Sequence, residues 1–243
     1  DAKWPFAMTE FIILAIIVMI TAIGRRKKWH GRWFETRRVA EYFRHAPIML
    51  LLGVARPSGR WPRGADTEWP EFYAREVLRE LGLPSVKIDH AYLHAILDTL
   101  LRQHASGQRI YHEAKAKRLA RVHRGLDHLS EVMFSLAILS VATYLTLLFI
   151  ASAGLISSDV PHDLSKIFTF LGVGLPALGG ASAGIRYFGD FERFASISEI
   201  TAEKLAEVEA RIATLLRAAE GQLSYAQVAA LAHSIDDIVV TEI

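Results

Sequence analysis

Apolar and polar residues are strongly segregated along this chain of 243 residues. Three apolar runs cover residues 4–24, 132–156 and 167–185. A helix needs about 20 apolar residues to cross the hydrocarbon core of a bilayer, so each run predicts a transmembrane helix. The polar segment 157–166 contains Pro161 and predicts a loop, so the second and third runs together predict a helical hairpin.

The first run begins at Trp4, a residue type that is common at membrane interfaces. It ends at the basic sequence RRKK, residues 25–28. A secretory signal peptide is the alternative, but here the positive charge follows the apolar run instead of preceding it. Glu10 is the one acidic residue in the run, and we expect it near the outer interface. Because the chain begins with Asp1, we expect either further sequence upstream or a start close to this residue.

The polar segments have helical periodicity and contain no convincing strand. Asp89 is expected to cap one helix, and Ser224 and Gln227 have the spacing of a capping box. A helix over residues 33–54 is either broken or kinked at Pro47. The other expected helices cover residues 69–81, 90–104 (ending by Gly107), 108–129 (running on into the second apolar run), 191–219 and 225–238. The predicted fold is an all-α membrane protein with three transmembrane helices, one N-terminal and two in a hairpin, and a helical cytoplasmic region.

The basic residues predict an orientation in the membrane. Residues 25–128 hold 21 of the 28 Lys and Arg residues and 11 acidic residues, a net charge of +10, whereas the loop 157–166 holds one Lys and two Asp. The positive-inside rule therefore places the basic region in the cytoplasm. The predicted parts are an N-terminal transmembrane helix (1–24), a basic cytoplasmic region (25–131), a transmembrane hairpin (132–185) and a cytoplasmic amphipathic tail (186–243).

The composition excludes several classes of protein. Hydrophobic residues make up 51% of the chain and charged residues 22%, and the segregation of the two is unlike a disordered, collagen-like or ordinary soluble chain. Because the chain has no cysteine, a disulfide framework, a thiolate metal site and a thiol nucleophile are excluded.

Small residues are concentrated in the third apolar run, where they allow membrane helices to approach closely. Pro176 is expected to kink this helix. The predicted helix-packing residues are Gly172, Gly174, Pro176, Gly179, Gly180 and Gly184. The sequence from Thr169, TFLGVG, is loosely similar to a potassium filter, but a filter needs an extended loop and this run lies inside a predicted helix.

Hydroxyl side chains mark the second apolar run, and a weakly polar helix face can line a pore. The candidate pore-lining residues are Ser135, Ser140, Thr143, Thr146 and Ser152. The alternative is that these hydroxyls donate hydrogen bonds to the backbone of their own helix.

A second candidate for self-association lies in the tail. Seven residues recur there at alternating steps of four and three, which is the spacing of a coiled-coil seam. The apolar members predict an oligomer seam of Phe194, Leu205, Val208, Ile212 and Leu215. The other two members, Ser198 and Thr201, are polar, so packing within one protomer is the alternative.

The chain shows no motif for catalysis or for cofactor binding. His90 and His94 have the i, i+4 spacing of metal ligands, but no third ligand is evident, which favours packing or surface histidines. We therefore assign no catalytic, cofactor-binding or metal-binding residue and expect no enzyme activity. The basic region favours contact with anionic lipid over specific binding of nucleic acid.

Four stretches together resemble one family. They are WFETRRVAEYFR (33–44), WPEFYAREVLRELGLPS (69–85), Gln108 with Tyr111 and His112, and PALGGASAGIRYFGDFERFASISEITAEKL (176–205). These stretches resemble SLATT domains, the two-span effector modules of bacterial conflict systems. The resemblance implies a membrane-disrupting or pore-forming effector that has no catalytic residues and is coupled to a nucleotide-sensing domain, such as a nucleotidyltransferase or a SLOG-type domain. The apolar run 4–24 is extra to the family pattern, and no sensor is visible in the chain.

We therefore expect a homo-oligomeric effector of the bacterial inner membrane that forms or gates a pore in response to a cytoplasmic signal. Anionic lipid is the expected partner, together with a nucleotide-sensing domain or protein upstream. The alternative is a non-conducting, membrane-anchored sensor or scaffold that binds a nucleotide or a partner protein in the cytoplasm.

Overall fold

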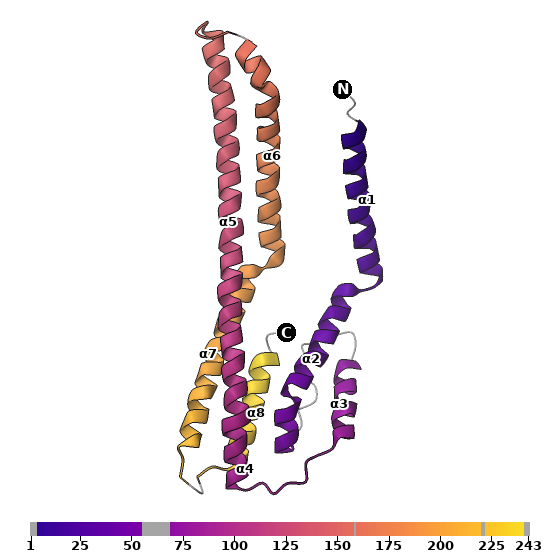
Figure 1. Ribbon diagram of the computed structural model, residues 1–243, viewed down its shortest axis with the longest axis vertical. Coiled ribbons are helices and arrows are strands. Elements are labelled where there is room, and N and C mark those ends of the chain that lie inside the picture. Colours follow the sequence, from indigo (N-terminus) through magenta and orange to yellow (C-terminus); the bar gives the residue numbers. More distant parts are fainter. Residues whose placement is uncertain (1–3, 55–68, 158, 220–221, 241–243) are drawn as a thin grey trace. The chain divides into compact units, whose positions relative to one another are not determined.

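The computed structural model describes residues 4–54, 69–157, 159–219 and 222–240. Every regular element in these ranges is helical, which confirms the all-α prediction. The elements are α1 (Trp4–Arg26), α2 (Trp29–Leu52), α3 (Trp69–Leu81), α4 (His90–Ala95), a π-helical turn (Ile96–Leu101), α5 (Arg102–Ser152), α6 (Asp159–Gly189), α7 (Phe191–Leu216) and α8 (Tyr225–Val240), as shown in Figure 1.

Among the described residues, three helical stretches are long and apolar enough to cross a membrane. They are α1, the stretch His90–Ser152 that ends with α5, and the stretch Asp159–Leu216 that begins with α6. The chain divides into two compact units, which we describe separately. The first comprises the described residues of Asp1–Ala105 and Glu207–Ile243, and the second comprises those of Ser106–Ala206.

In the first unit, α1 confirms the first predicted span and extends it to Arg26. None of its side chains is buried. A helix that is apolar and exposed on all sides suits hydrocarbon, because its own backbone satisfies its hydrogen bonds. The helix ends before Lys28, which adopts a left-handed conformation with φ 48°, and α2 follows at once.

The helix α2 begins at Trp29 and passes through Pro47 without a break. It ends at Leu52 and is capped by Gly53, whose φ is 65°. There the Gly53 N–H donates to the Leu50 carbonyl at 3.0 Å and the Val54 N–H donates to the Met49 carbonyl at 3.0 Å. These two bonds satisfy carbonyls that the helix end would otherwise leave without partners.

Two tyrosine hydroxyls hold the same end of α2. Tyr92 of α4 donates to the Leu51 carbonyl and Tyr225 of α8 donates to the Leu52 carbonyl, each at 2.8 Å. Segments far apart in the sequence therefore meet at the end of α2. The fully buried side chains of this unit include Leu52, Leu97, Leu101, Ile212, Val228 and Ile235.

The predicted helix end by Gly107 is wrong. The stretch that begins with α4 continues through the π-helical turn and through Gly107 to Ser152. Glycine inside a helix costs about 1 kcal/mol relative to alanine, and burial of Leu101 and Ala105 just before it offsets this cost. The predicted start is confirmed, since Asp89 Oδ1 accepts a hydrogen bond from the Tyr92 N–H at 2.9 Å.

In the second unit, α5 and α6 form the predicted hairpin, but both of its predicted inner boundaries are wrong. The helix α5 ends at Ser152 instead of Ile156, because Gly154 adopts φ 73° and closes the helix with hydrogen bonds from its own N–H and from that of Leu155. The helix α6 begins at Asp159, inside the predicted loop 157–166.

Pro161, the residue that predicted the loop, lies within α6. It lies in the first turn of α6, where the missing N–H has no carbonyl partner to lose. Farther along, α6 also continues through Pro176.

The last two helices follow their predictions closely. The helix α7 ends at Leu216, three residues before the predicted end. The helix α8 begins with the predicted capping box, in which the Ser224 N–H donates to Gln227 Oε1 at 2.9 Å and the Gln227 N–H donates to Ser224 Oγ at 3.3 Å.

Gly179 is the point of tight contact in the hairpin. A Cβ atom placed there would lie 3.1 Å from Phe134 Cε2 and 3.3 Å from Met133 Cβ of α5. Its carbonyl accepts a hydrogen bond from the buried hydroxyl of Ser130 at 3.1 Å. At Gly180, the next residue, a Cβ atom would meet nothing within 4 Å.

These neighbouring glycines provide a matched test of the packing. We expect Gly179→Ala to destabilise the hairpin by about 1–3 kcal/mol, because the added methyl overpacks the contact with α5. Gly180→Ala adds the same group in open space, and it should be neutral or stabilise the helix by up to about 1 kcal/mol. Thermal unfolding of both variants in one detergent measures the difference. Equal melting temperatures for the wild type and Gly179→Ala would contradict the tight contact.

Candidate functional site

The predicted helix-packing residues of α6 divide between two sides of the helix. Gly179 lies against α5. A Cβ atom placed on Gly172 would lie 3.8 Å from Val141 Cγ2 of the same helix α5. Gly180 and Gly184 have no heavy atom within 4 Å of such a Cβ. Of the remaining two predicted residues, Gly174 approaches only the Phe170 ring of its own helix, and Pro176 is half-buried.

The outward side of α6 is made of small residues. Ala177, Gly180 and Ala181 are exposed and Gly184 is half-buried. At 3.6 residues per turn these four residues share one face of the helix. The hairpin therefore uses one side of α6 internally and presents a smooth, small-residue side outward.

Three of the five candidate pore-lining hydroxyls bind their own helix. Thr143 donates to the Leu139 carbonyl and Thr146 to the Ala142 carbonyl, both at 2.8 Å, and Ser152 donates to the Phe149 carbonyl at 2.7 Å. All three residues are exposed. Each oxygen keeps its acceptor lone pairs, so the helix side that Thr143 and Thr146 share is weakly polar although the hydroxyl protons are occupied, and Ser152 lies off this side.

The other two candidates differ from each other. Ser135 is exposed, whereas Ser140 is buried. Among the described residues, Ser140 Oγ has no hydrogen-bond partner. Ser140 therefore does not share the exposed environment of Thr143 and Thr146.

The predicted oligomer seam is largely covered within the chain. Leu205, Val208 and Ile212 are buried and Leu215 is half-buried. Phe194 is exposed. This burial matches the alternative of packing within one protomer, and it leaves Phe194 as the seam residue with the most surface for a second copy.

Polar and charged residues meet just outside the apolar part of the hairpin. Arg186 of α6 forms an ion pair with Asp127 of α5, and His123 Nε2 lies 3.8 Å from Glu192 Oε2. The sequence prediction missed the pairing of Asp127 with Arg186. Opposite charges that flank two antiparallel spans at the same end were the available signal.

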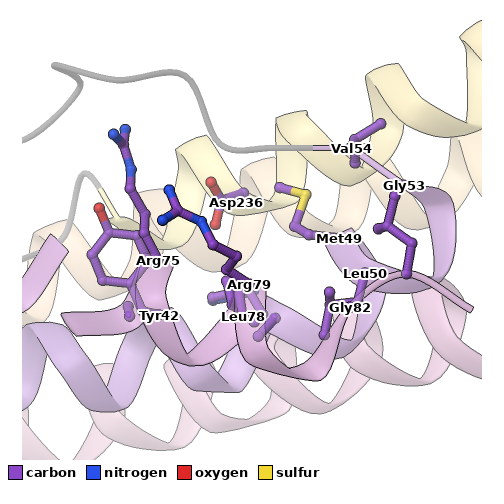
Figure 2. Close-up of a pocket in the computed structure, with 14 residues that line it drawn as sticks. Tyr42, Met49, Leu50, Gly53, Val54, Arg75, Leu78, Arg79, Gly82 and Asp236 are labelled. Atoms are coloured by element: carbon purple, nitrogen blue, oxygen red, sulfur yellow. The ribbon is translucent and has the colours of Figure 1, made fainter. Parts of the chain in front are cut away.

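The first unit contains a groove of about 660 Å³ between α2 and α3. Figure 2 shows residues of both helices along it, with Asp236 of α8 at its edge. Tyr42, Arg75, Arg79 and Asp236 gather toward one end of the groove in this view. Apolar residues such as Met49 line the other end. No motif in the sequence predicted this groove, because it depends on how α2 packs against α3.

Two histidines meet beside this groove. His45 Nδ1 of α2 and His104 Nε2 of α5 are 3.1 Å apart, so one ring donates a hydrogen bond to the other. Burial lowers the pKa of His104 below its ordinary value of 6.5, and the Arg44 guanidinium lowers it further, while Asp236 acts in the opposite direction. His45 and Asp236 are themselves buried. The surroundings therefore favour the neutral form of the His104 ring.

The histidines singled out by spacing behave differently. The rings of His90 and His94 are 6.3 Å apart, centre to centre, and both residues are half-buried. In the part of the chain that the structure describes, no three His, Cys, Asp or Glu side chains are grouped so that they could hold a metal ion. His45 and His104 are 59 residues apart in sequence, which is why no local pattern indicated them.

Comparison with known proteins finds no matching family model, no matching curated protein and no matching solved structure. The resemblance to SLATT domains therefore depends on the sequence stretches given above.

The histidine pair predicts a pH dependence with a definite sign. Because the folded pKa of His104 lies below the unfolded value of 6.5, the neutral ring stabilises the fold above that pH. This contribution is lost as the pH falls below 6.5 toward the folded pKa. We expect the protection factors of amides in the C-terminal half of α2, which correct for the slower intrinsic exchange at lower pH, to decrease on acidification over this window.

His104→Gln is the matched variant, since its amide can still donate to His45 but does not titrate. It should show a smaller pH effect than the wild type, whereas His94→Gln should behave as the wild type. The same decrease in protection factors in His104→Gln and in the wild type would show that this pair is not responsible.

Proposed function

We propose that this chain is a non-enzymatic membrane effector that self-associates through the outward side of α6 and forms or gates a pore. The observation that carries the proposal is the open space around Gly180 and Gly184. Lipid provides no hydrophobic driving force for apolar helices to associate. Membrane helices therefore associate by van der Waals contact, which small residues allow by letting the backbones approach closely. A second copy of the hairpin could approach the α6 backbone at these positions without a clash.

The exposed hydroxyls of α5 supply the polar surface for a path. Thr143 and Thr146 donate to their own backbone, so they remain compatible with lipid in an unassembled hairpin. Their acceptor lone pairs are free to face water or ions once several hairpins surround a common axis. Under this proposal the same face serves both the separate and the assembled states.

The finer parts of the proposal come from the sequence. The 21 basic residues in 25–128 support a cytoplasmic location for that region and contact with anionic lipid. The resemblance to SLATT domains supports a bacterial inner membrane, a role in defence and an upstream nucleotide-sensing domain or protein. No step of the proposed function needs a catalytic residue, a cofactor or a specific nucleic acid.

One observation favours a second candidate function, a non-conducting membrane-anchored sensor or scaffold. The groove between α2 and α3 has the size of a small-molecule site, and it lies beside the buried His45–His104 pair. In this version α1 and the hairpin only anchor the protein, and the outward side of α6 faces lipid.

The double variant Gly180→Leu/Gly184→Leu separates the two functions. The added side chains should block close approach of a second α6, so we expect loss of the oligomer and at least a tenfold decrease in ion flux from liposomes. Gly125→Leu is the control, because Gly125 is an exposed position of α5 outside the apolar run, and a Cβ atom placed there meets nothing within 4 Å. Mass determination in lipid nanodiscs measures the oligomer, and a fluorescent ion indicator measures flux. An unchanged oligomer and unchanged flux in the double variant would refute assembly through this face.

A further inference from the structure

The groove between α2 and α3 has the dimensions and composition of a ligand site. Its volume of about 660 Å³ falls within the range of about 300–1,000 Å³ for small-molecule pockets. Met49, Leu50 and Val54 of the α2 end line it from one side, and Leu78 and Leu83 line it from the other. All five side chains are aliphatic or thioether groups, which recognise an apolar chain by contact alone.

Positive charge is placed at one end of this apolar groove. Arg75 and Arg79 are one turn apart on α3, and Figure 2 shows both extending beside Tyr42 and Asp236, away from Val54. Their side chains are 49% and 77% exposed. Asp236 is only 3% exposed and interacts with other groups of the protein. An incoming molecule therefore meets the two guanidinium groups first.

The present partners of these arginines are easily exchanged. Arg75 pairs with Glu71, and Arg79 pairs with Glu76 at 3.1 Å, both within α3. The Glu76 side chain is 40% exposed, and ion pairs of this exposed, intrahelical kind are weak. A phosphate or carboxylate offers guanidinium a two-point hydrogen-bond partner, so it can replace Glu76 at Arg79. At Arg75 it can bind beside Glu71, whose side chain is only 18% exposed.

The lining disfavours an aromatic base as the apolar part of the ligand. Proteins commonly hold bases by stacking them on aromatic or guanidinium planes. Tyr42 and His45 are the aromatic residues among the lining residues, and they are only 7% and 3% exposed. Arg75 and Arg79 are the available guanidinium planes, and both lie at the charged end of the groove. An alkyl chain matches the remaining surface better, since Met49, Leu50 and Leu78 offer flexible, unbranched or singly branched contacts.

We propose that this groove binds a small anionic amphiphile, with a phosphate or carboxylate head at Arg75 and Arg79 and a single alkyl chain along Met49 toward Val54. Free alkyl anions and single-chain lipids released from the membrane share this chemistry. The proposal goes beyond the pore, because binding is measured without ion flux and holds or fails independently of it.

The test uses the full chain in nanodiscs of neutral phosphatidylcholine, with decyl phosphate as the probe and empty nanodiscs as the blank. Titration calorimetry gives the affinity, and hydrogen exchange locates the site. We expect slower exchange at the C-terminal end of α2 and in α3. We also expect decanol, which lacks the anion, to bind at least tenfold more weakly. A lysophosphatidic acid of the same chain length, compared with decyl phosphate, identifies which of the two sources fits better.

Three variants make the result specific. Arg75→Gln/Arg79→Gln should weaken binding at least tenfold, and Leu83→Ser should weaken it severalfold; these residues are exposed, so the fold should be retained. Arg102→Gln is the control, because Arg102 is an exposed arginine in an i, i+4 pair with Asp98 and does not line the groove.

Several outcomes would overturn the proposal. Equal affinity of the wild type and Arg75→Gln/Arg79→Gln would mean that the probe partitions into lipid or binds elsewhere. Equal binding of decanol and decyl phosphate would mean that the anion is not recognised. Binding of ATP in place of decyl phosphate would assign the groove to a nucleotide.

Discussion

The arrangement of the hairpin depends on how closely α5 and α6 approach at Gly179. Hydrocarbon gives apolar helices no hydrophobic reason to pair, so pairing requires direct van der Waals contact and hydrogen bonds. Gly179 supplies both, because Phe134 and Met133 fill the space where a side chain would stand and Ser130 donates to its carbonyl. With this side of α6 filled, the small residues around Gly180 are left on the opposite side, and that is the surface on which the proposed assembly depends.

Features governed by local energetics could be predicted from the sequence. Length and hydropathy gave the three spans, and side-chain chemistry gave the cap at Asp89 and the capping box of Ser224 with Gln227. The boundary errors have equally local causes. Pro161 fits the first turn of a helix as well as it fits a loop, so its presence alone did not fix where α6 begins. The second apolar run continues to residue 156, beyond the end of α5 at Ser152. Hydropathy alone therefore did not show that Gly154 ends the helix.

The candidate sites needed tertiary structure, for which one sequence holds no direct signal. Periodicity shows that Gly180 and Gly184 share a face of the helix. Only the packing of the two helices shows that Gly179 faces α5, whereas Gly180 and Gly184 face away from it. The pairing of His45 with His104 joins residues 59 positions apart, whereas spacing drew attention to His90 and His94. The groove could not be predicted for the same reason. The sequence predicts the helices α2 and α3 one at a time, and the groove forms only where α2 packs beside α3.

The two units differ in the interactions that can respond to a signal. The contact at Gly179 is steric and apolar, so a change of pH or the binding of a small anion should change its strength little. The first unit instead places a histidine pair, a buried carboxylate and two exposed arginines around one groove. Of these groups, His104 can change its charge and the arginines can exchange their partners. In the proposed scheme, sensing therefore belongs to the groove and conduction to the hairpin. A protein that senses but does not conduct would keep the first set of interactions and lack only the assembly through α6.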